Sequence, residues 1–450
     1  MGDHRGKSLV LVASPFQGHM TPMLQLGGVL HSKGFSITIA HTKLNSPDPS
    51  NHPEFAFLPL FDKFLAIDAS GNFTKFLEEL NENCKMQLQH HLAQKITNEV
   101  NQKITIIHDN IMYFAEEVAR NLNLPSIVFR SCSACYLPAY LKLPQLHAEG
   151  LLPVKDYMLQ KLVPELHPLR FKDLPFNNTS TELFKEMLAL AERIRTPSAI
   201  IWNTIDFLEH SVLTQLRKHY KIPIFDIGPL NEMARCSSTS FLEEDTNCIS
   251  WLDKQAPRSV IYVSLGSLAT MDETELAETA WGLADSKQPF LWVVRPGSVN
   301  GSEWIEFLPD GFMEEIKGRG LVLKWVPQKQ VLAHAAVGGF WSHCGWNSTL
   351  ESISKGVPMI CRPVMGDQCV NARYLSFIWR VGLELEYLER KVIVNAIRRL
   401  LVDDEGKEIR KRAITMKEKV KYSLCKGGSS FNSLNDLVEY IVQDHTIVGN

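Results

Sequence analysis

Several features that would place the chain in other protein classes are missing from its 450 residues. Basic residues are not in excess, since 47 Lys and Arg stand against 50 Asp and Glu, whereas a general nucleic-acid-binding protein carries a basic excess or stripe. No apolar run reaches the roughly 18 residues that span a membrane. The residues before Ser8 are polar and lack the apolar centre of a signal peptide. We therefore expect a cytoplasmic protein without a membrane span or a nucleic-acid partner.

Motifs of three other site types are also absent. No G-x-G-x-x-G follows an apolar run, which argues against a nicotinamide-dependent oxidoreductase. No G-x-S-x-G is present, which argues against a hydrolase with a serine nucleophile. No D-x-D occurs, so the usual carboxylate clamp for a metal-bound nucleotide is missing, and we predict no metal site. The 9 cysteines are odd in number and irregularly spaced, which fits a reducing compartment.

Apolar runs alternate with helical patterns in two series along the chain. The first series predicts strands at 8–13, 35–40, 104–108, 126–130 and 199–202, with a helix from about Thr21 to Lys33. The second predicts strands at 260–265, 290–294, 321–325, 337–341 and 358–361, and helices at 273–285, 389–402, 408–422 and 430–442. This pattern is typical of parallel sheets covered by helices on both faces. We predict an α/β fold of two Rossmann-like, doubly wound domains facing each other across a cleft.

A polar, acidic, Ser/Thr-rich stretch without clear periodicity separates the two series. We therefore place an N-terminal domain at residues 1–230, a linker at 231–247, a C-terminal domain at 248–428 and a last helical segment at 429–450.

Residues 325–368 carry the polar groups that a nucleotide-sugar requires. Trp325 and Gln328 suit the face and edge of a planar base. Gly345 lets the backbone approach a ligand closely. Asn347 and Ser348 stand where a helix N-cap is expected, and a helix start favours a diphosphate.

Four further side chains complete this set. His343 follows an apolar strand and can donate to a phosphate oxygen, while Glu351 lies one helical turn beyond the helix start at Asn347 and Ser348 and can accept from ribose hydroxyls. Asp367 and Gln368 follow the next strand and suit the hydroxyls of a sugar. Since parallel strands deliver their carboxyl ends to one edge, these groups can converge on one ligand.

A second constellation lies in the N-terminal half. His19 is expected on the loop after the first strand, where a histidine can act as a general base. Asp109 ends the 104–108 strand, and the first and fourth strands of such a sheet would be neighbours. The two residues would form a base and an orienting carboxylate, with the nucleophile supplied by the substrate. Loop or capping roles are the alternatives for both residues, and His41, His108 and His334 are alternative histidines.

Residues 325–368, including the H-C-G-W-N-S centre and the closing Asp-Gln, resemble the full donor-binding signature of plant secondary-product UDP-glycosyltransferases. The P-F-Q-G-H stretch ending at His19 resembles the family's catalytic region. Three stretches, 281–287, 308–312 and 426–430, resemble a subgroup that includes steviol glycoside, cytokinin and benzoxazinoid glucosyltransferases. The resemblance implies the two-domain GT-B architecture, with the last helix packing back on the N-terminal domain. It implies His19 and Asp109 as the catalytic dyad and these donor-binding residues: Ser267, Trp325, Val326, Gln328, His343, Gly345, Trp346, Asn347, Ser348, Glu351, Asp367 and Gln368.

The resemblance also implies the reaction. An acceptor hydroxyl attacks the sugar opposite the departing UDP, which gives a β-glucoside without a metal or other cofactor. Gln368 resembles glucose-using members, so UDP-glucose is the expected co-substrate. The expected acceptor wall of Phe16, Ile111, Met112, Ser131, Gly366 and residues 176–194 is mostly apolar, although several of these residues can equally be core. We expect a monomer that glucosylates a lipophilic terpenoid, flavonoid or phenolic, or a glycoside of one. N-glucosylation of a cytokinin and a non-catalytic nucleotide-sugar-binding protein are the alternatives.

Overall fold

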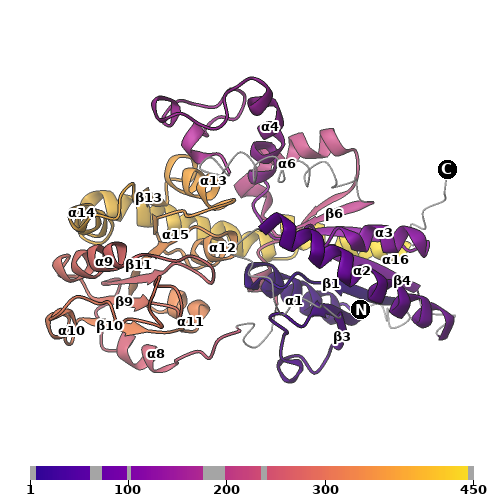
Figure 1. Ribbon diagram of the computed structural model, residues 1–450, viewed down its shortest axis with the longest axis horizontal. Coiled ribbons are helices and arrows are strands. Elements are labelled where there is room, and N and C mark those ends of the chain that lie inside the picture. The colour runs from indigo at the N-terminus through magenta and orange to yellow at the C-terminus, as the bar shows by residue number, and fades with distance from the viewer. Residues whose placement is uncertain (1–6, 61–72, 99–102, 176–197, 235–240, 444–450) are drawn as a thin grey trace. The chain divides into compact units, whose positions relative to one another are not determined.

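The computed structural model describes residues 7–60, 73–98, 103–175, 198–234 and 241–443 (Figure 1). The chain forms two compact units. The first comprises Met1–Pro153, Asn178–Phe241 and Tyr422–Asn450, and the second comprises Val154–Asn177 and Leu242–Lys421. Among the described residues, no helix has both the length and the apolar character needed to cross a membrane.

A seven-stranded parallel sheet forms the centre of the first unit, in the order β3-β2-β1-β4-β5-β6-β7. Its strands are β1 (Lys7–Val12), β2 (Ser36–Thr42), β3 (Ala56–Leu60), β4 (Lys103–Asp109), β5 (Ser126–Arg130), β6 (Ala199–Trp202) and β7 (Ile224–Asp226). The predicted pairing of the first strand with the 104–108 strand is confirmed, since Val12 is in register with His108. The strand order reverses between β1 and β4, and in such sheets the ligand site lies where the chain leaves these two strands.

Alternating side chains of β1 pack on both faces of this sheet. Leu9 and Leu11 belong to a core that includes α16 (Ser429–Gln443), whereas Val10 and Val12 belong to a core that includes α2 (Phe73–Asn98) and α3 (Phe114–Asn121). This two-sided burial explains why the strand reads as a continuous apolar run. The helices of the unit are α1 (Gln17–Ser32), α2 (Phe73–Asn98), α3 (Phe114–Asn121), α4 (Tyr136–Ala148), α6 (Asp206–Tyr220), α7 (Leu230–Met233) and α16 (Ser429–Gln443).

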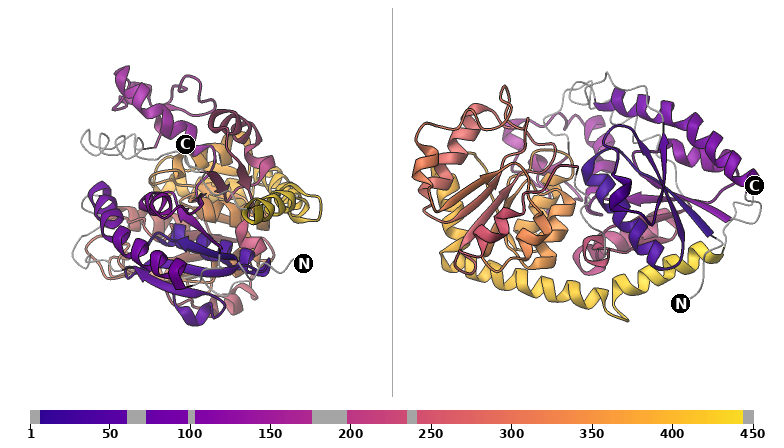
Figure 2. Two further views of the ribbon diagram at one scale, coloured as in Figure 1. Left: turned by 90° about the vertical axis from the view of Figure 1, so that its right-hand side faces the viewer. Right: turned by 90° about the horizontal axis from the view of Figure 1, so that it is seen from below.

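The last helix is part of the first unit. Leu434, Leu437 and Ile441 of α16 pack in the same core as Leu9, and Lys7 Nζ donates to the carbonyl oxygen of Ile441 at 3.0 Å. Figure 2 shows this helix running beside the strands of the sheet.

A six-stranded parallel sheet forms the second unit, in the order β10-β9-β8-β11-β12-β13. Its strands are β8 (Val260–Ser264), β9 (Phe290–Val293), β10 (Gly320–Leu323), β11 (Val337–Ser342), β12 (Met359–Cys361) and β13 (Gly382–Glu384). The helices are α8 (Asn247–Leu252), α9 (Glu273–Asp285), α10 (Phe312–Glu315), α11 (Gln328–Ala333), α12 (Trp346–Lys355), α13 (Gln368–Arg373), α14 (Arg390–Leu401) and most of α15 (Asp404–Leu424). The strand order reverses between β8 and β11, so the expected ligand site follows these strands.

The units differ from the predicted domains in one large respect. Val154–Asn177 lies inside the predicted N-terminal domain of 1–230 but belongs to the second unit. The physical reason is a cluster of ion pairs that joins this segment to α13 and β13. At the carboxyl end the change of unit falls within α15, between Lys421 and Tyr422.

Candidate active site

His19 and Asp109 meet at the reversal point of the first sheet. Asp109 is the last residue of β4, and its buried Oδ2 lies 2.8 Å from His19 Nδ1, whose side chain is 29% exposed. The other carboxylate oxygen, Oδ1, accepts a hydrogen bond from the Ile111 backbone at 3.0 Å. A carboxylate that accepts from Nδ1 selects the tautomer in which Nε2 carries the lone pair and can take a proton.

His19 lies in a helix rather than on the predicted loop. Helix α1 begins at Gln17, and the backbone amides of His19 and Met20 both donate to the Phe16 carbonyl, at 2.9 and 2.8 Å. The predicted helix start near Thr21 is therefore four residues too late. A proline lacks an amide donor and is tolerated best in the first turn of a helix. Pro22 nevertheless lies further inside α1. The histidine is therefore fixed by a helical backbone as well as by Asp109.

Part of the predicted acceptor wall surrounds this pair. Ser131 Oγ lies 3.2 Å from His19 Nδ1, and the Phe16 ring centroid lies 6.2 Å from that of the histidine. Ile111 and Phe16 are only partly buried, so both keep accessible surface. Met112 differs from these residues, because its side chain is fully buried in the core that contains Phe76 and Leu77 and offers no accessible surface to an acceptor. Residues 176–194 lie outside the described residues.

The alternative histidines have other surroundings. His108 is buried, its Nδ1 faces the Asp109 carbonyl oxygen, and burial lowers its pKa to about 4. His41 Nδ1 lies 2.8 Å from the Thr42 carbonyl oxygen. His334 pairs with Asp253 in the second unit. Of the four histidines considered, His19 is the one that the structure pairs with the Asp109 carboxylate.

In the second unit, two glycines enclose His343 at the reversal point of the sheet. Gly266 follows β8, and Gly345 follows His343 at the end of β11. A Cβ at Gly266 would lie 2.6 Å from His343 Nε2, and one at Gly345 would lie 2.4 Å from the same atom. Gly266 also has a φ of +79°, which a side chain would strain. Burial lowers the pKa of His343 to about 4, so the imidazole is neutral near pH 7 and can donate one N–H.

The helix start that was predicted to favour an anion is present at α12, but its N-cap lies two residues before the predicted Asn347. Gly345 is the N-cap of α12, and its carbonyl accepts from the Thr349 amide at 2.9 Å. Asn347 and Ser348 are therefore the second and third helical residues rather than caps, because the chain turns at the glycine. The Trp346 indole is 3% exposed and lies near Trp379. A contribution of Trp346 to donor binding would therefore come from its backbone.

A hydrogen-bond network joins three predicted donor-binding residues. Gln328 Nε2 donates to Glu351 Oε2 at 2.7 Å and to Ser348 Oγ at 3.0 Å. Tyr262, which sequence reasoning did not select, donates from its hydroxyl to Gln328 Oε1 at 3.1 Å. An aromatic residue within an apolar strand looks like core, and Tyr262 is indeed buried in β8. Its hydroxyl nevertheless fixes which way the Gln328 amide points.

Trp325 and Val326, two of the predicted donor-binding residues, differ in which of their groups can reach a ligand. The Trp325 carbonyl accepts from the Asp245 amide at 3.0 Å, and its indole is half-buried. The Val326 side chain is buried, so this residue can reach a ligand only through its main chain.

Asp367 and Gln368 open α13 in orientations set by nearby groups. Asn371 Nδ2 donates to Asp367 Oδ2 at 3.0 Å and to the Cys344 carbonyl at 2.9 Å. Gln368 Oε1 accepts from the amides of Val364 and Met365, at 2.8 and 3.0 Å, so the group of Gln368 that is left to contact a sugar hydroxyl is its NH₂ donor.

Two further predicted residues lie in this unit. Gly366, with a φ of +63°, has open space where a Cβ would stand. Ser267 lies beside Gly266 and is half-buried. The second unit thus carries every predicted donor-binding residue.

Comparisons with known proteins agree with this architecture. Residues 226–417 match the family described as UDP-glucoronosyl and UDP-glucosyl transferase. UDP-glycosyltransferase 76E1 of Solanum lycopersicum is 52% identical over 97% of this chain and 93% of its own length. UDP-glycosyltransferase 76H1 of Stevia rebaudiana is 54% identical over 93% of this chain and 99% of its own length. Among solved structures, Phytolacca americana UGT2 complexed with UDP-2fluoro-glucose and pterostilbene has a TM-score of 0.83 and 27% identity, covering 98% of this chain and 100% of that chain.

The two relatives and the solved structure match the chain over both units rather than over the donor signature alone. The two parallel-sheet domains have the GT-B fold of their structural neighbours. The chain is therefore a glycosyltransferase enzyme and belongs to the plant UDP-glycosyltransferases.

Proposed function

We propose that the enzyme transfers glucose from UDP-glucose to a hydroxyl group of a lipophilic small molecule, with inversion to a β-glucoside. The 2.8 Å contact between His19 and a buried Asp109 carries this proposal, because it provides a base with a fixed tautomer. The donor-side groups of the second unit and the UDP-2fluoro-glucose of the Phytolacca complex support the donor.

The proposed first event is removal of the acceptor proton. His19 Nε2 takes the hydroxyl proton, and Asp109 stabilises the resulting imidazolium through Nδ1–H. The acceptor oxygen then bonds to the anomeric carbon while the bond from that carbon to the UDP oxygen breaks. An attack from the face opposite UDP converts an α-linked donor into a β-linked product. Both sets of groups lie within one chain, so we propose a monomer as the active species.

The proposed stabilisation of the leaving diphosphate uses neutral donors. His343 donates one N–H, the start of α12 presents its first-turn amides, and Ser267 contributes a hydroxyl. The Gln328–Ser348–Glu351 network would hold the ribose, and Asp367 with Gln368 would hold the sugar hydroxyls. Because these groups take the place of a cation, we propose that turnover is independent of added metal.

The surroundings of His19 support an apolar acceptor. Phe16 and Ile111 offer apolar surface beside the imidazole, and Ser131 offers a hydroxyl near the same ring. The pterostilbene of the Phytolacca complex is a molecule of this kind. We propose a terpenoid, flavonoid or other phenolic, free or already glycosylated, as the acceptor class.

Mass spectrometry of reaction products tests this function. The purified chain would be incubated with UDP-glucose, EDTA and a pooled panel of terpenoid, flavonoid, phenolic-acid and cytokinin acceptors. We expect a product heavier by one hexose whose anomeric proton coupling in NMR spectra identifies the β-linkage. An N-linked or ester-linked product would revise the acceptor group, an α-linked product would contradict inversion, and a strict metal requirement would contradict the neutral-donor account.

A further inference from the structure

Residues 154–175 leave the first unit and fold as part of the second. The chain belongs to the first unit up to Pro153 and again from Asn178, but the intervening segment belongs to the second. The segment folds on itself, since the Val163 amide donates to the Leu169 carbonyl at 2.9 Å and the Lys172 amide donates to the Leu159 carbonyl at 3.0 Å. We call residues 154–175 the strap.

The strap presents Arg170 to two carboxylates at once. The Arg170 guanidinium donates to both oxygens of Asp173 and to both oxygens of Glu384, all at 2.8–2.9 Å. Burial alone would lower the pKa of Arg170, but the hydrogen bonds and charges of Asp173 and Glu384 outweigh burial and raise it. Only a planar guanidinium has the donor geometry for this arrangement, and a lysine would not reproduce it.

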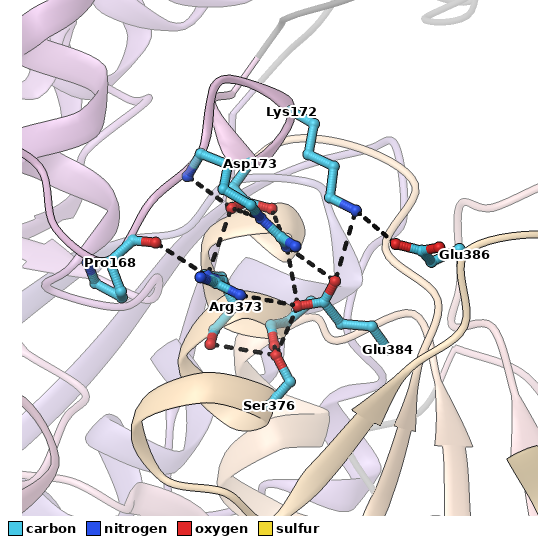
Figure 3. Close-up of polar contacts among 9 residues, drawn as sticks. Pro168, Lys172, Asp173, Arg373, Ser376, Glu384 and Glu386 are labelled. Atoms are coloured by element: carbon cyan, nitrogen blue, oxygen red, sulfur yellow. Dashed lines mark hydrogen bonds and ion pairs between the residues drawn. The ribbon is translucent and has the colours of Figure 1, made fainter. Parts of the chain in front are cut away.

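The same cluster reaches the end of helix α13 (Figure 3). Arg373, the last residue of α13, donates from Nε to the Pro168 carbonyl at 2.9 Å and lies 3.8 Å from Asp173 Oδ2. Its Nη1 lies 3.6 Å from Glu384 Oε1. Arg170, Asp173 and Arg373 are each about one-tenth exposed, so solvent screens their interactions less than those of a surface pair.

The cluster balances its charges and includes β13. Lys172 Nζ lies 3.7 Å from Glu384 Oε2 and 3.1 Å from Glu386 Oε1, so three basic side chains face three acidic ones. Ser376 Oγ donates to Glu384 Oε1 at 2.8 Å. Glu384 ends β13, so the strap is joined to a strand of the sheet as well as to α13.

Helix α13 connects this cluster to the sugar end of the donor site. It has six residues, so its axis is about 9 Å long at 1.5 Å per residue. Asp367 and Gln368 stand at its first end, and Arg373 stands at its last. Between them, Cys369 is half-buried, and burial together with the charges of Asp173 and Asp367 raises the pKa of its thiol to about 12. One short rigid element therefore carries both the strap contact and the groups proposed to hold the sugar.

We propose that Arg170 is a positioning residue that acts through Asp173, Glu384 and Arg373 to hold α13 where Asp367 and Gln368 can bind glucose. The inference rests on the proposed function, because it assigns the sugar hydroxyls to these two residues. The uracil and ribose side of the site, built on α11 and α12, has its own network around Gln328. Loss of Arg170 therefore weakens binding of the glucose portion and leaves binding of UDP unchanged.

Equilibrium binding to the full chain tests this proposal. Isothermal titration calorimetry would give the Kd of UDP and the Kd of UDP-glucose for the wild type, Arg170→Ala and Arg170→Lys. We expect Arg170→Ala to raise the ratio of the UDP-glucose Kd to the UDP Kd about tenfold, by analogy with the lower end of the losses at metal sites when a group that orients a direct ligand is removed. Arg170→Lys should raise the ratio less than Arg170→Ala, because it keeps the positive charge between the carboxylates. It should still raise the ratio above that of the wild type, because one amine cannot bridge both carboxylates.

Arg399→Ala is the matched control. Arg399 also makes a two-bond pair with a carboxylate in the second unit, donating to Glu405 at 2.8 and 2.9 Å, but it lies on α14. This variant should leave the ratio unchanged. An unchanged ratio in Arg170→Ala would overturn the proposal, whether both ligands keep their wild-type Kd or both Kd values rise by the same factor. If Arg170→Ala does not fold, Arg170→Lys and Glu384→Gln decide by the same ratio. A wild type that binds UDP but not UDP-glucose would instead refute the proposed function.

Discussion

Substituting Gly266 by alanine tests the arrangement around His343. The new Cβ would lie 2.6 Å from both Cε1 and Nε2 of the His343 ring. Cβ contacts under 3.0 Å essentially never occur, so the imidazole must move. Gly297→Ala is a matched control in the same unit, because Gly297 has a similar φ of +71° and nothing within 4 Å of its Cβ position. Both variants carry the backbone cost of a left-handed residue, about 1–2 kcal/mol, but only Gly266→Ala displaces the histidine.

The magnitude follows from the hydrogen bond that His343 is proposed to make. A hydrogen bond to a charged phosphate contributes about 1.5–3 kcal/mol. At 1.4 kcal/mol per factor of ten, its loss raises the Kd of UDP about ten- to hundredfold. Titration calorimetry with UDP measures this change, and thermal unfolding of both variants measures the shared backbone cost. If Gly266→Ala and Gly297→Ala bind UDP equally well, the His343 ring is not the phosphate donor and the reasoning is wrong.

Three other predictions concern single groups. Asp109→Asn should lower kcat at least about a hundredfold, since general-base catalysis contributes about 10²–10⁴, while UDP-glucose binding by titration stays unchanged; an equal loss in binding would contradict the role. Burial lowers the pKa of His343 from 6.5 to about 4. Between pH 6.5 and about pH 4, the His343 side chain is therefore protonated in the unfolded chain and neutral in the folded chain. The unfolding free energy should therefore fall as pH drops through this window, and urea titrations should show a smaller fall in His343→Gln. Tyr262→Phe should weaken UDP binding about fivefold, since a net hydrogen bond contributes about 1 kcal/mol. A wild-type affinity for UDP, measured by calorimetry, would show that the Tyr262 hydroxyl is not needed to orient Gln328.

Long apolar strands could be located closely from the sequence. β5 and β6 match their predicted ranges of 126–130 and 199–202, and α9 matches 273–285. Strands that are buried on both faces form continuous apolar runs rather than alternating apolar and polar residues, so their ends are marked by the first polar residue on each side. The three-residue strands β7 (Ile-Phe-Asp) and β13 (Gly-Leu-Glu) were not predicted, because each includes a charged residue and neither forms an apolar run. The equally short β12 (Met-Ile-Cys) is apolar throughout and was predicted at 358–361. Helix α2 was also not predicted, although its buried Leu77, Leu80, Cys84 and Leu88 recur at helical spacing.

Candidate donor-side and acceptor-side residues could be named from the sequence, but the burial of each side chain could not be predicted. Met112 and Trp346 carry suitable chemistry, yet their side chains are buried. Burial depends on packing partners that the local pattern does not contain. The strap could not be predicted at all, because Arg170 pairs with Glu384 across 214 positions of sequence. No periodic signal links two charged residues at that separation.

The most direct test of the central claim compares two acceptors with wild type and His19→Ala. One is an aliphatic alcohol, which needs a base to lose its proton. The other is a nitrophenol, which is already ionised at mildly alkaline pH and needs none. We predict that His19→Ala lowers kcat/KM for the alcohol by about 10²-fold or more and changes it far less for the nitrophenolate. An equal loss with both acceptors would contradict the assignment of His19 as the base.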